Sequence, residues 1–317
     1  MVYHYCNVGT FLNIIKNHTL RMSDIFKSTD NLEAKSILDL VQNRIYDMYV
    51  KDGGFGCSPI YGMDKDNAFK YILERVMKNI RSDSERLYYV ACFSEKYDLL
   101  GQWREYADKS RGIAIGFDEK WFVKLCETDK EMFRFEKVQY VHNDKNVDEI
   151  IQDRAELIYS GILKDIDSYN TQGLLESQFK VSYDIVLAKK LLYEDSIFIK
   201  RKEFEIEQEW RLVLDDEIEK TRDDWEYYYN WKNEECNSQD FIHKIFPNAL
   251  EFMERNGKIV SYLDLKYDTM DEMPVKEIIL GSDCKVGEND VYHLLGFYGY
   301  DVNDINILRS KLSYRWI

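Results

Sequence analysis

"RLYYVACFS", residues 86–94, is the stretch that decides the fold of this 317-residue chain. It is almost wholly apolar and rich in residues that favour strands, a pattern typical of a strand buried in a sheet. "GIAIGFD", residues 112–118, predicts a second buried strand, which Gly116 and Asp118 end. Because Ser94 closes the first strand, its hydroxyl is expected where the sheet meets a loop.

The apolar periodicity predicts further elements on both sides of these strands. A short strand is expected at residues 2–6, followed by a helix that Thr10 caps. "KIVSYLDL", "VKEIILGS" and "DINILRS" predict three strands near the C-terminus, with a helix near 288–298. Another strand is expected at 204–214.

These elements indicate an α+β chain with a central mixed or antiparallel sheet. Apolar residues at helical spacing predict helical insertions at about 30–82 and 147–194. An acidic, aromatic-rich insertion is expected at about 215–256. With only 3 Pro and 15 Gly there is little room for a linker, so residues 1–317 are predicted to form a single domain.

Composition and charge narrow the function classes. A net charge of −15 repels phosphate backbones at long range, which disfavours generic nucleic-acid binding and attachment to anionic membranes. The six cysteines are scattered, which fits reduced thiols and neither a disulfide framework nor a zinc site. The chain has no apolar window of membrane-spanning length and no export signal at its start, so a cytoplasmic protein is expected.

A run of glutamates in "KEFEIEQEWRLVL", residues 202–214, is the first candidate for chemistry. Strand alternation would place Glu207, Glu209 and Arg211 on one face. A solvated sheet edge explains such a face, and so does a site for a hydroxyl-rich or cationic ligand. Because unpaired like charges are costly, Arg211 is predicted to be buried and paired with one of four carboxylates, namely Glu207, Glu209, Asp98 or Glu105.

The segment that follows the central strand, "ACFSEKYDLLGQWREYADKSRGIAIGFD", is the second candidate. Packing of a helix on the sheet explains Leu99 and Trp103 best. Arg104 and Tyr106 lie near a strand end, where ligands collect, and an aromatic ring there could stack on a flat heterocycle.

The first strand contributes His4 and Tyr5. A core histidine with a satisfied hydrogen bond is one interpretation of His4, and a ligand contact is the other. Alternation puts His4 on the face opposite Tyr3 and Tyr5. The ligand interpretation predicts that His4 contacts Glu209 or a ligand between them.

Five blocks resemble those of a widespread bacterial family of unknown function that is often found in mobile or defence-related gene neighbourhoods. They are "VYHYCNVGTFLNIIKNHTLRMSD", the 91–118 segment, "FEIEQEWRLV", "VKEIILGS" and "LRSKLSYR", which together run from residue 2 to about 315. The family often has proline in the final block and after the glycine of "ILG", where this chain has Leu312 and Ser282.

The order of His, Ser and Glu-x-Glu along the chain is also similar to that of ADP-ribosyltransferases. This likeness implies that His4 binds the NAD adenosine ribose or its surroundings and that Ser94 supports the nicotinamide pocket. It also implies that Tyr106 or Trp103 stacks on nicotinamide. Tyr5, Arg104 and Arg211 complete the set of expected binding residues.

The same likeness assigns catalysis to Glu209, which would hold the 2′-hydroxyl of the nicotinamide ribose, while Glu207 would face the acceptor. Glu207 could equally be the key acid. The expected function is an NAD-consuming ADP-ribosyltransferase-like enzyme that requires no metal and acts in anti-phage defence or as a toxin. The acceptor is a protein or a nucleic acid. A non-catalytic module that senses a nucleotide or a partner, and a metal-independent nucleotide hydrolase, are the alternatives.

Overall fold

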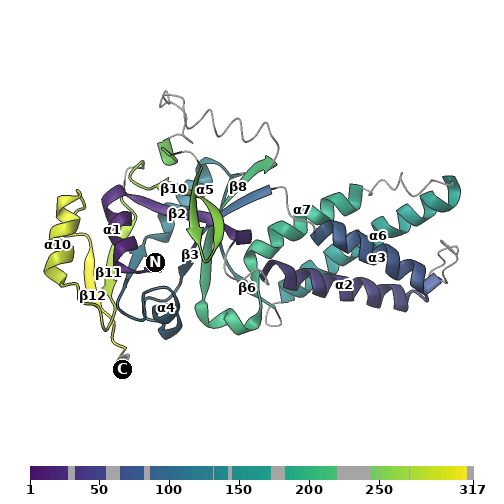
Figure 1. The fold of residues 1–317 in the computed structure, drawn as a ribbon, viewed down its shortest axis with the longest axis horizontal. Coiled ribbons are helices and arrows are strands. Elements are labelled where there is room, and N and C mark those ends of the chain that lie inside the picture. Colours follow the sequence, from purple (N-terminus) through teal and green to yellow (C-terminus); the bar gives the residue numbers. More distant parts are fainter. Residues whose placement is uncertain are drawn as a thin grey trace. The chain divides into compact units, whose positions relative to one another are not determined.

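The computed structural model describes residues 1–27, 33–54, 65–81, 86–130, 132–141, 145–172, 183–219, 244–248, 250–270 and 272–312. The chain divides into two compact units. The first, here called the sheet unit, comprises Met1–Ser28, Glu85–Val138 and Phe204–Ile317. The second, the helical unit, comprises Thr29–Ser84 and Gln139–Glu203. Figure 1 follows the chain by colour.

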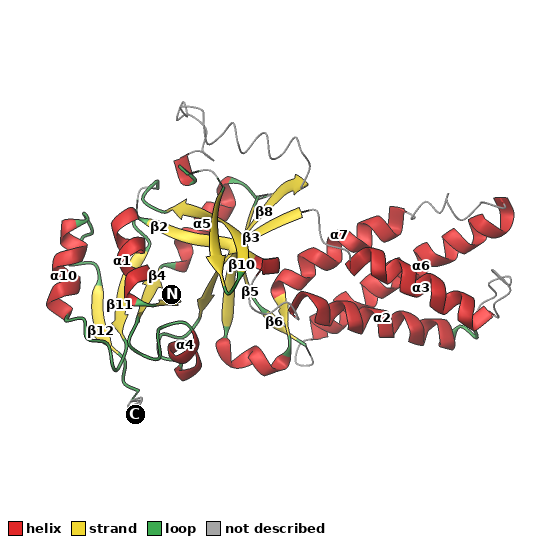
Figure 2. Ribbon diagram, in the orientation of Figure 1, coloured by secondary structure: helices red, strands yellow, loops and turns green. Residues whose placement is uncertain are grey.

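The sheet unit is built on a ten-stranded mixed sheet (Figure 2). Eight strands follow one another across it in the order β12 (Asn306–Arg309), β11 (Val275–Leu280), β4 (Ile113–Phe117), β1 (Val2–Cys6), β3 (Arg86–Ser94), β2 (Thr19–Asp24), β10 (Lys258–Lys266) and β9 (Glu251–Arg255). β8 (Glu209–Glu219) pairs with β3, and β5 (Phe133–Lys137) pairs with β8. β11 and β12 are parallel, and the other pairs of this sheet are antiparallel.

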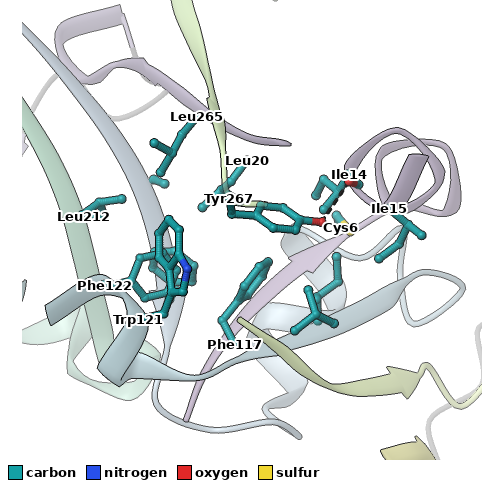
Figure 3. Packing of buried hydrophobic residues seen from close by; sticks show 14 of the residues in the cluster. Cys6, Ile14, Ile15, Leu20, Phe117, Trp121, Phe122, Leu212, Leu265 and Tyr267 are labelled. Carbon is teal, nitrogen blue, oxygen red and sulfur yellow. Dashed lines mark hydrogen bonds between the residues drawn. The ribbon is translucent and has the colours of Figure 1, made fainter. Parts of the chain in front are cut away.

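One face of the sheet carries the main core of the unit. Three helices contribute to it: α1 (Val8–Asn17), α5 (Glu119–Thr128) and α10 (Glu288–Phe297). Each presents apolar residues at helical spacing, as Phe11, Ile14 and Ile15 do in α1. Figure 3 shows Tyr267 in this core with its hydroxyl near α1, where it donates to the Ile14 carbonyl at 3.0 Å. That bond links the residue that follows β10 to the last turn of α1.

The helical unit contains α2 (Glu33–Lys51), α3 (Lys65–Arg81), α6 (Lys145–Gln172) and α7 (Tyr183–Phe198). They share one hydrophobic core, in which the rings of Tyr49 and Phe69 stack with centroids 3.9 Å apart. Two short parallel strands, β6 (Gln139–Tyr140) and β7 (Ile199–Lys200), complete the unit. These helices occupy the two segments for which the sequence predicts helical insertions.

Several predicted elements are confirmed and several need correction. The strand at residues 2–6 and the strand at residues 86–94 are observed with those bounds. The first helix, however, is capped by Asn7, whose side chain accepts a hydrogen bond from the Thr10 amide. β2, β5 and β9 and the helix α5 were not predicted. Most of the expected acidic insertion, residues 220–243, lies outside the described residues.

The strand expected at 204–214 is shorter at its start and longer at its end. Lys202–Glu207 form a 3₁₀ helix, and β8 begins only at Glu209. Between them Gln208 adopts a left-handed conformation, with φ of 45°. Among the described helices none is both long and apolar enough to cross a membrane.

Candidate functional site

Ser94 and Glu209 are neighbours on one face of the sheet. They form a cross-strand pair between β3 and β8, and Tyr3 of β1 pairs with Ser94 on the other edge of β3. Directly paired residues of an antiparallel sheet point to the same side. Alternation adds Tyr5 and Arg211 to this side, which we call the Glu209 face; the main core lies on the opposite face.

Arg211 holds the carboxylate of Glu209 with two nitrogens. Its Nε lies 2.7 Å from Glu209 Oε1, and its Nη2 lies 3.3 Å from Oε2. Arg211 is 2% exposed and Glu209 5% exposed, so the pair is almost fully removed from water. This confirms the predicted burial of Arg211 and selects Glu209 from the four carboxylates considered.

Glu207 does not share that face as a strand residue, and this part of the prediction is wrong. It ends the 3₁₀ helix, and the left-handed Gln208 breaks the alternation between Glu207 and Glu209. The main chain of Glu207 nevertheless meets the site, because Ser94 Oγ donates to its carbonyl at 2.8 Å. Ser94 Oγ also accepts from the Lys96 amide at 3.3 Å, so this hydroxyl fixes two segments at the end of β3.

Tyr5 and Trp103 meet edge to face on the Glu209 face, with ring centroids 4.9 Å apart. The Tyr5 hydroxyl donates to the Lys96 carbonyl at 2.8 Å and accepts from the Leu99 amide at 3.1 Å. Burial raises the pKa of the Tyr5 phenol, which keeps its proton in place for the first of these bonds. Trp103 is fully buried in α4 (Leu100–Glu105), in agreement with the packing interpretation.

Arg104 and Tyr106 are exposed at the end of α4, and Tyr106 is 47% exposed. Arg104 is adjacent to Trp103 in α4 and therefore points to a different side of the helix. Tyr106 is three residues after Trp103, but it lies beyond the last residue of α4 as its C-cap. The structure therefore does not join them to Ser94 and Glu209. An exposed ring retains its capacity to stack on a ligand.

His4 lies on the face opposite Tyr3, Tyr5 and Glu209. Alternation places it with Val2 and Cys6, which belong to the main core, and its ring meets that of Phe93 at 6.1 Å. The expected contact between His4 and Glu209 is therefore not formed. The reason is the register, because the pairing of Tyr3 with Ser94 brings the odd residues of β1 to the Glu209 face.

His4 lies where β1 and β2 separate from each other along one edge of β3. On the same edge of β3, Ser94 pairs with β1, whereas Val90 and Tyr89 pair with β2. Between these contacts the Cys92 carbonyl meets the His4 side chain, whose Nδ1 lies 3.0 Å away. A carbonyl only accepts hydrogen bonds, so His4 Nδ1 carries the proton.

Burial also lowers the pKa of the His4 imidazole below its ordinary value of 6.5, and the bond to Cys92 opposes this only in part. Near neutral pH the ring is therefore neutral, with its lone pair on Nε2. His4 thus satisfies a backbone group, as the core interpretation requires, and keeps an acceptor atom on Nε2.

The sequence did not reveal how completely the loop after Ser94 is anchored. Asp98, expected as one partner of Arg211, instead accepts from Trp103 Nε1 at 2.8 Å and Ser310 Oγ at 2.6 Å. Its second oxygen accepts from the Lys311 amide at 3.0 Å. Its spacing from Trp103 was the only local signal, because Ser310 is more than two hundred residues away.

A metal centre is not formed by the residues that the structure describes. They contain no group of three or more His, Cys, Asp or Glu side chains arranged to hold a metal ion.

Fold and site together define an α+β protein with a mixed sheet and a buried Glu–Arg pair at the end of its central strand. Residues 102–212 carry a DUF2971 domain, since they match the family model described as "Protein of unknown function (DUF2971)". The match includes Trp103, Glu209 and Arg211, while His4 and Ser94 precede it. Comparisons with curated proteins and with solved structures found no match.

Proposed function

We propose that the Glu209 face binds NAD and that the protein is an ADP-ribosyltransferase-like enzyme. The observation that carries this proposal is the direct pairing of Ser94 with Glu209 at the end of β3. Ser94 and Glu209 are more than a hundred positions apart in the sequence, yet they are adjacent on one face. The likeness to ADP-ribosyltransferases implies that these two residues share one pocket. The aromatic rings of Tyr3 and Tyr5 lie on the same face.

The reaction requires a carboxylate at this place. The bond between C1′ of the ribose and the nicotinamide nitrogen breaks, and nicotinamide leaves with the electron pair. The acceptor's nucleophilic oxygen or nitrogen then bonds to C1′ and releases its proton. Positive charge develops on the ribose meanwhile, and a carboxylate bonded to the 2′-hydroxyl stabilises that charge.

Glu209 and Glu207 differ in burial and in the groups they contact. Arg211 already engages both oxygens of Glu209, which orients the carboxylate but competes with a ribose hydroxyl. Glu207 is partly exposed, and its carbonyl is bound to Ser94. We therefore favour Glu209 as the group that fixes the ribose and Glu207 as the group that faces the acceptor.

His4 supports the proposal only indirectly. Its neutral ring, with the proton held on Nδ1, offers Nε2 as an acceptor to a hydroxyl such as that of the adenosine ribose. Because it lies on the opposite face of the sheet, this contact would have to be made where β1 and β2 diverge.

The test is to incubate the purified protein with NAD and measure nicotinamide release. Glu209→Gln should reduce release at least about a hundredfold, as expected for loss of a charge-stabilising group. Glu207→Gln should retain nicotinamide release and lose transfer to the acceptor. Glu203→Gln, at an exposed position just before the site, is the matched control and should retain activity. A protein that neither binds NAD nor releases nicotinamide would refute the proposal.

A non-catalytic nucleotide-sensing module is the second candidate. It is favoured by the burial of Glu209 and its engagement by Arg211, because a carboxylate so occupied can position a ligand without stabilising a transition state. Saturable NAD binding without nicotinamide release would support this candidate. Cleavage of another nucleotide without nicotinamide release would instead support the metal-independent hydrolase.

The proposed role in anti-phage defence or as a toxin rests on the resemblance to families found in such gene neighbourhoods. Expression of the wild-type chain in a bacterial host should then slow growth or reduce phage yield. The Glu209→Gln variant should lose that effect.

A further inference from the structure

The segment from Glu95 to Ser110, which joins Ser94 to the strand β4, lies on the Glu209 face. Trp103 and Ala107 from this segment pack with Tyr3 and Tyr5, and Tyr97 packs against the same group. Since Tyr3 is paired with Ser94 and Ser94 with Glu209, this packing occurs directly beside the candidate site.

The first half of the segment is anchored by Tyr5 of β1 and by residues 310–312. Tyr5 of β1 binds the main chain of Lys96 and Leu99. Asp98 joins Trp103 of α4 to Ser310, which lies just beyond β12, and to the Lys311 amide. Leu312, two residues beyond Ser310, packs against the same aromatic group. The segment is therefore held to residues 310–312 by hydrogen bonds and apolar packing.

The second half of the segment holds strain. Asp108, Lys109 and Ser110 are consecutive and all left-handed, with φ of 45°, 57° and 68°. Each L-residue with a side chain adopts this region at a cost in free energy, and three in succession are rare. The turn is also pressed against Gly281, where an added Cβ would lie 2.2 Å from the Ser110 carbonyl oxygen.

Ser110 itself adds a second penalty. The residue is 1% exposed, and its hydroxyl finds no hydrogen-bond partner in the described part of the chain. A buried hydroxyl without a partner destabilises the arrangement that buries it. The main chain of the turn is also hydrogen-bonded, since the Ser110 amide donates to the Trp103 carbonyl at 3.0 Å and the Ser110 carbonyl accepts from the Asp283 amide at 3.1 Å. The strain of the turn and the buried hydroxyl therefore oppose the hydrogen bonds that hold the segment closed.

We propose that residues 95–110 form a strap that opens and closes over the Glu209 face. Opening breaks the Asp98–Ser310 contact, relaxes the left-handed turn and gives the Ser110 hydroxyl access to water. It also uncovers the face that carries Ser94 and Glu209. That the ligand admitted is NAD rests on the proposed function, whereas the opening itself does not.

Hydrogen exchange of the amides of residues 95–107, measured on the full-length protein without ligand, tests the strap. Ser310→Ala removes one anchoring bond and should speed their exchange about fivefold. Ser110→Gly removes the Cβ and the unpartnered hydroxyl and should slow their exchange about fivefold. Ser110→Ala, which keeps the Cβ, should give an intermediate rate.

Thr269→Ala is the matched control, since Thr269 donates a comparable hydroxyl bond, to Lys266 at 3.2 Å, away from the strap. It should leave exchange at residues 95–107 unchanged. If Ser310→Ala and Ser110→Gly shift exchange in the same direction, or if neither shifts it, the strap is refuted. Equal changes in β3 and β4 would also refute it, because they indicate global unfolding.

The association rate of NAD separates this proposal from the proposed function. Ser310→Ala should raise that rate and Ser110→Gly should lower it, in parallel with the exchange. If the exchange results hold but NAD does not bind to the wild-type protein, the strap stands and the assignment of NAD fails.

Discussion

Replacing Arg211 by alanine should be among the most destabilising single changes in the sheet unit. The guanidinium is 2% exposed and binds a carboxylate that is 5% exposed. Without Arg211 the Glu209 carboxylate loses its two-point contact in an environment that water barely reaches. Removal of one partner of a buried ion pair costs roughly 3–5 kcal/mol, because the remaining charge loses its compensation.

Removing both charges together should avoid part of the loss in free energy of unfolding that Arg211→Ala causes. Glu209→Gln combined with Arg211→Met removes both charges while keeping similar volumes, and buried pairs replaced in this way are often neutral or better in stability. We therefore expect the double variant to be at least about 2 kcal/mol more stable than Arg211→Ala. The exposed pair of Arg134 and Glu136 is the control, with side chains 35% and 47% accessible. Arg134→Ala should cost at most about 1 kcal/mol.

The assay is urea unfolding followed by tryptophan fluorescence, which reports on the sheet unit through Trp210 beside Arg211 and through the buried Trp103 and Trp121. Midpoints are compared at a common slope, so that a change in midpoint is a change in stability. A loss below about 1 kcal/mol for Arg211→Ala would refute the reasoning, since it would place the pair in the range of solvated surface pairs.

Two further predictions concern His4 and Gly281. Because burial lowers the pKa of His4 below 6.5, the unfolded chain binds a proton that the folded one does not, so stability should fall as the pH drops below about 6.5. His4→Asn retains a donor for the Cys92 carbonyl and should weaken the pH dependence of the free energy of unfolding, measured from pH 7.5 to 5. If the pH dependence is unchanged in this variant, another group causes it. Gly281→Ala would place a Cβ 2.2 Å from the Ser110 carbonyl and should cost about 1–3 kcal/mol by displacing the left-handed turn. A melting temperature equal to that of the wild-type protein would show that the turn can be displaced without loss of stability.

The sequence predicted the features that depend on local pattern. β1 and β3 have the bounds that their apolar and aromatic runs indicate. Alternation within a strand placed Glu209 among the four carboxylates expected to pair with Arg211, and the structure shows that pair.

What the sequence could not predict depends on register and on local backbone. The face on which His4 lies relative to Glu209 is set by the pairing of Tyr3 with Ser94, which joins distant parts of the chain. The exclusion of Glu207 from β8 depends on a left-handed Gln208, and the turn at Asp108, Lys109 and Ser110 is left-handed without a single glycine. No residue propensity indicates such conformations.

The helical unit is inserted into the sheet unit twice, and this fixes the order in which parts of the two units are synthesised. Residues 29–84 leave the sheet after β2 and return at β3, while residues 139–203 leave after β5 and return just before β8. α2 packs with α6 and α7, so the helical core is complete once residue 203 has been made. β8 emerges immediately afterwards and must then enter between β3 and β5, which until that moment lack their shared neighbour. Domains generally fold as units on the ribosome, and the pairs of β8 with β3 and β5 join residues made before the helical unit ends to residues made after it. Glu209, the first residue of β8, is made only after the last residue of the helical unit.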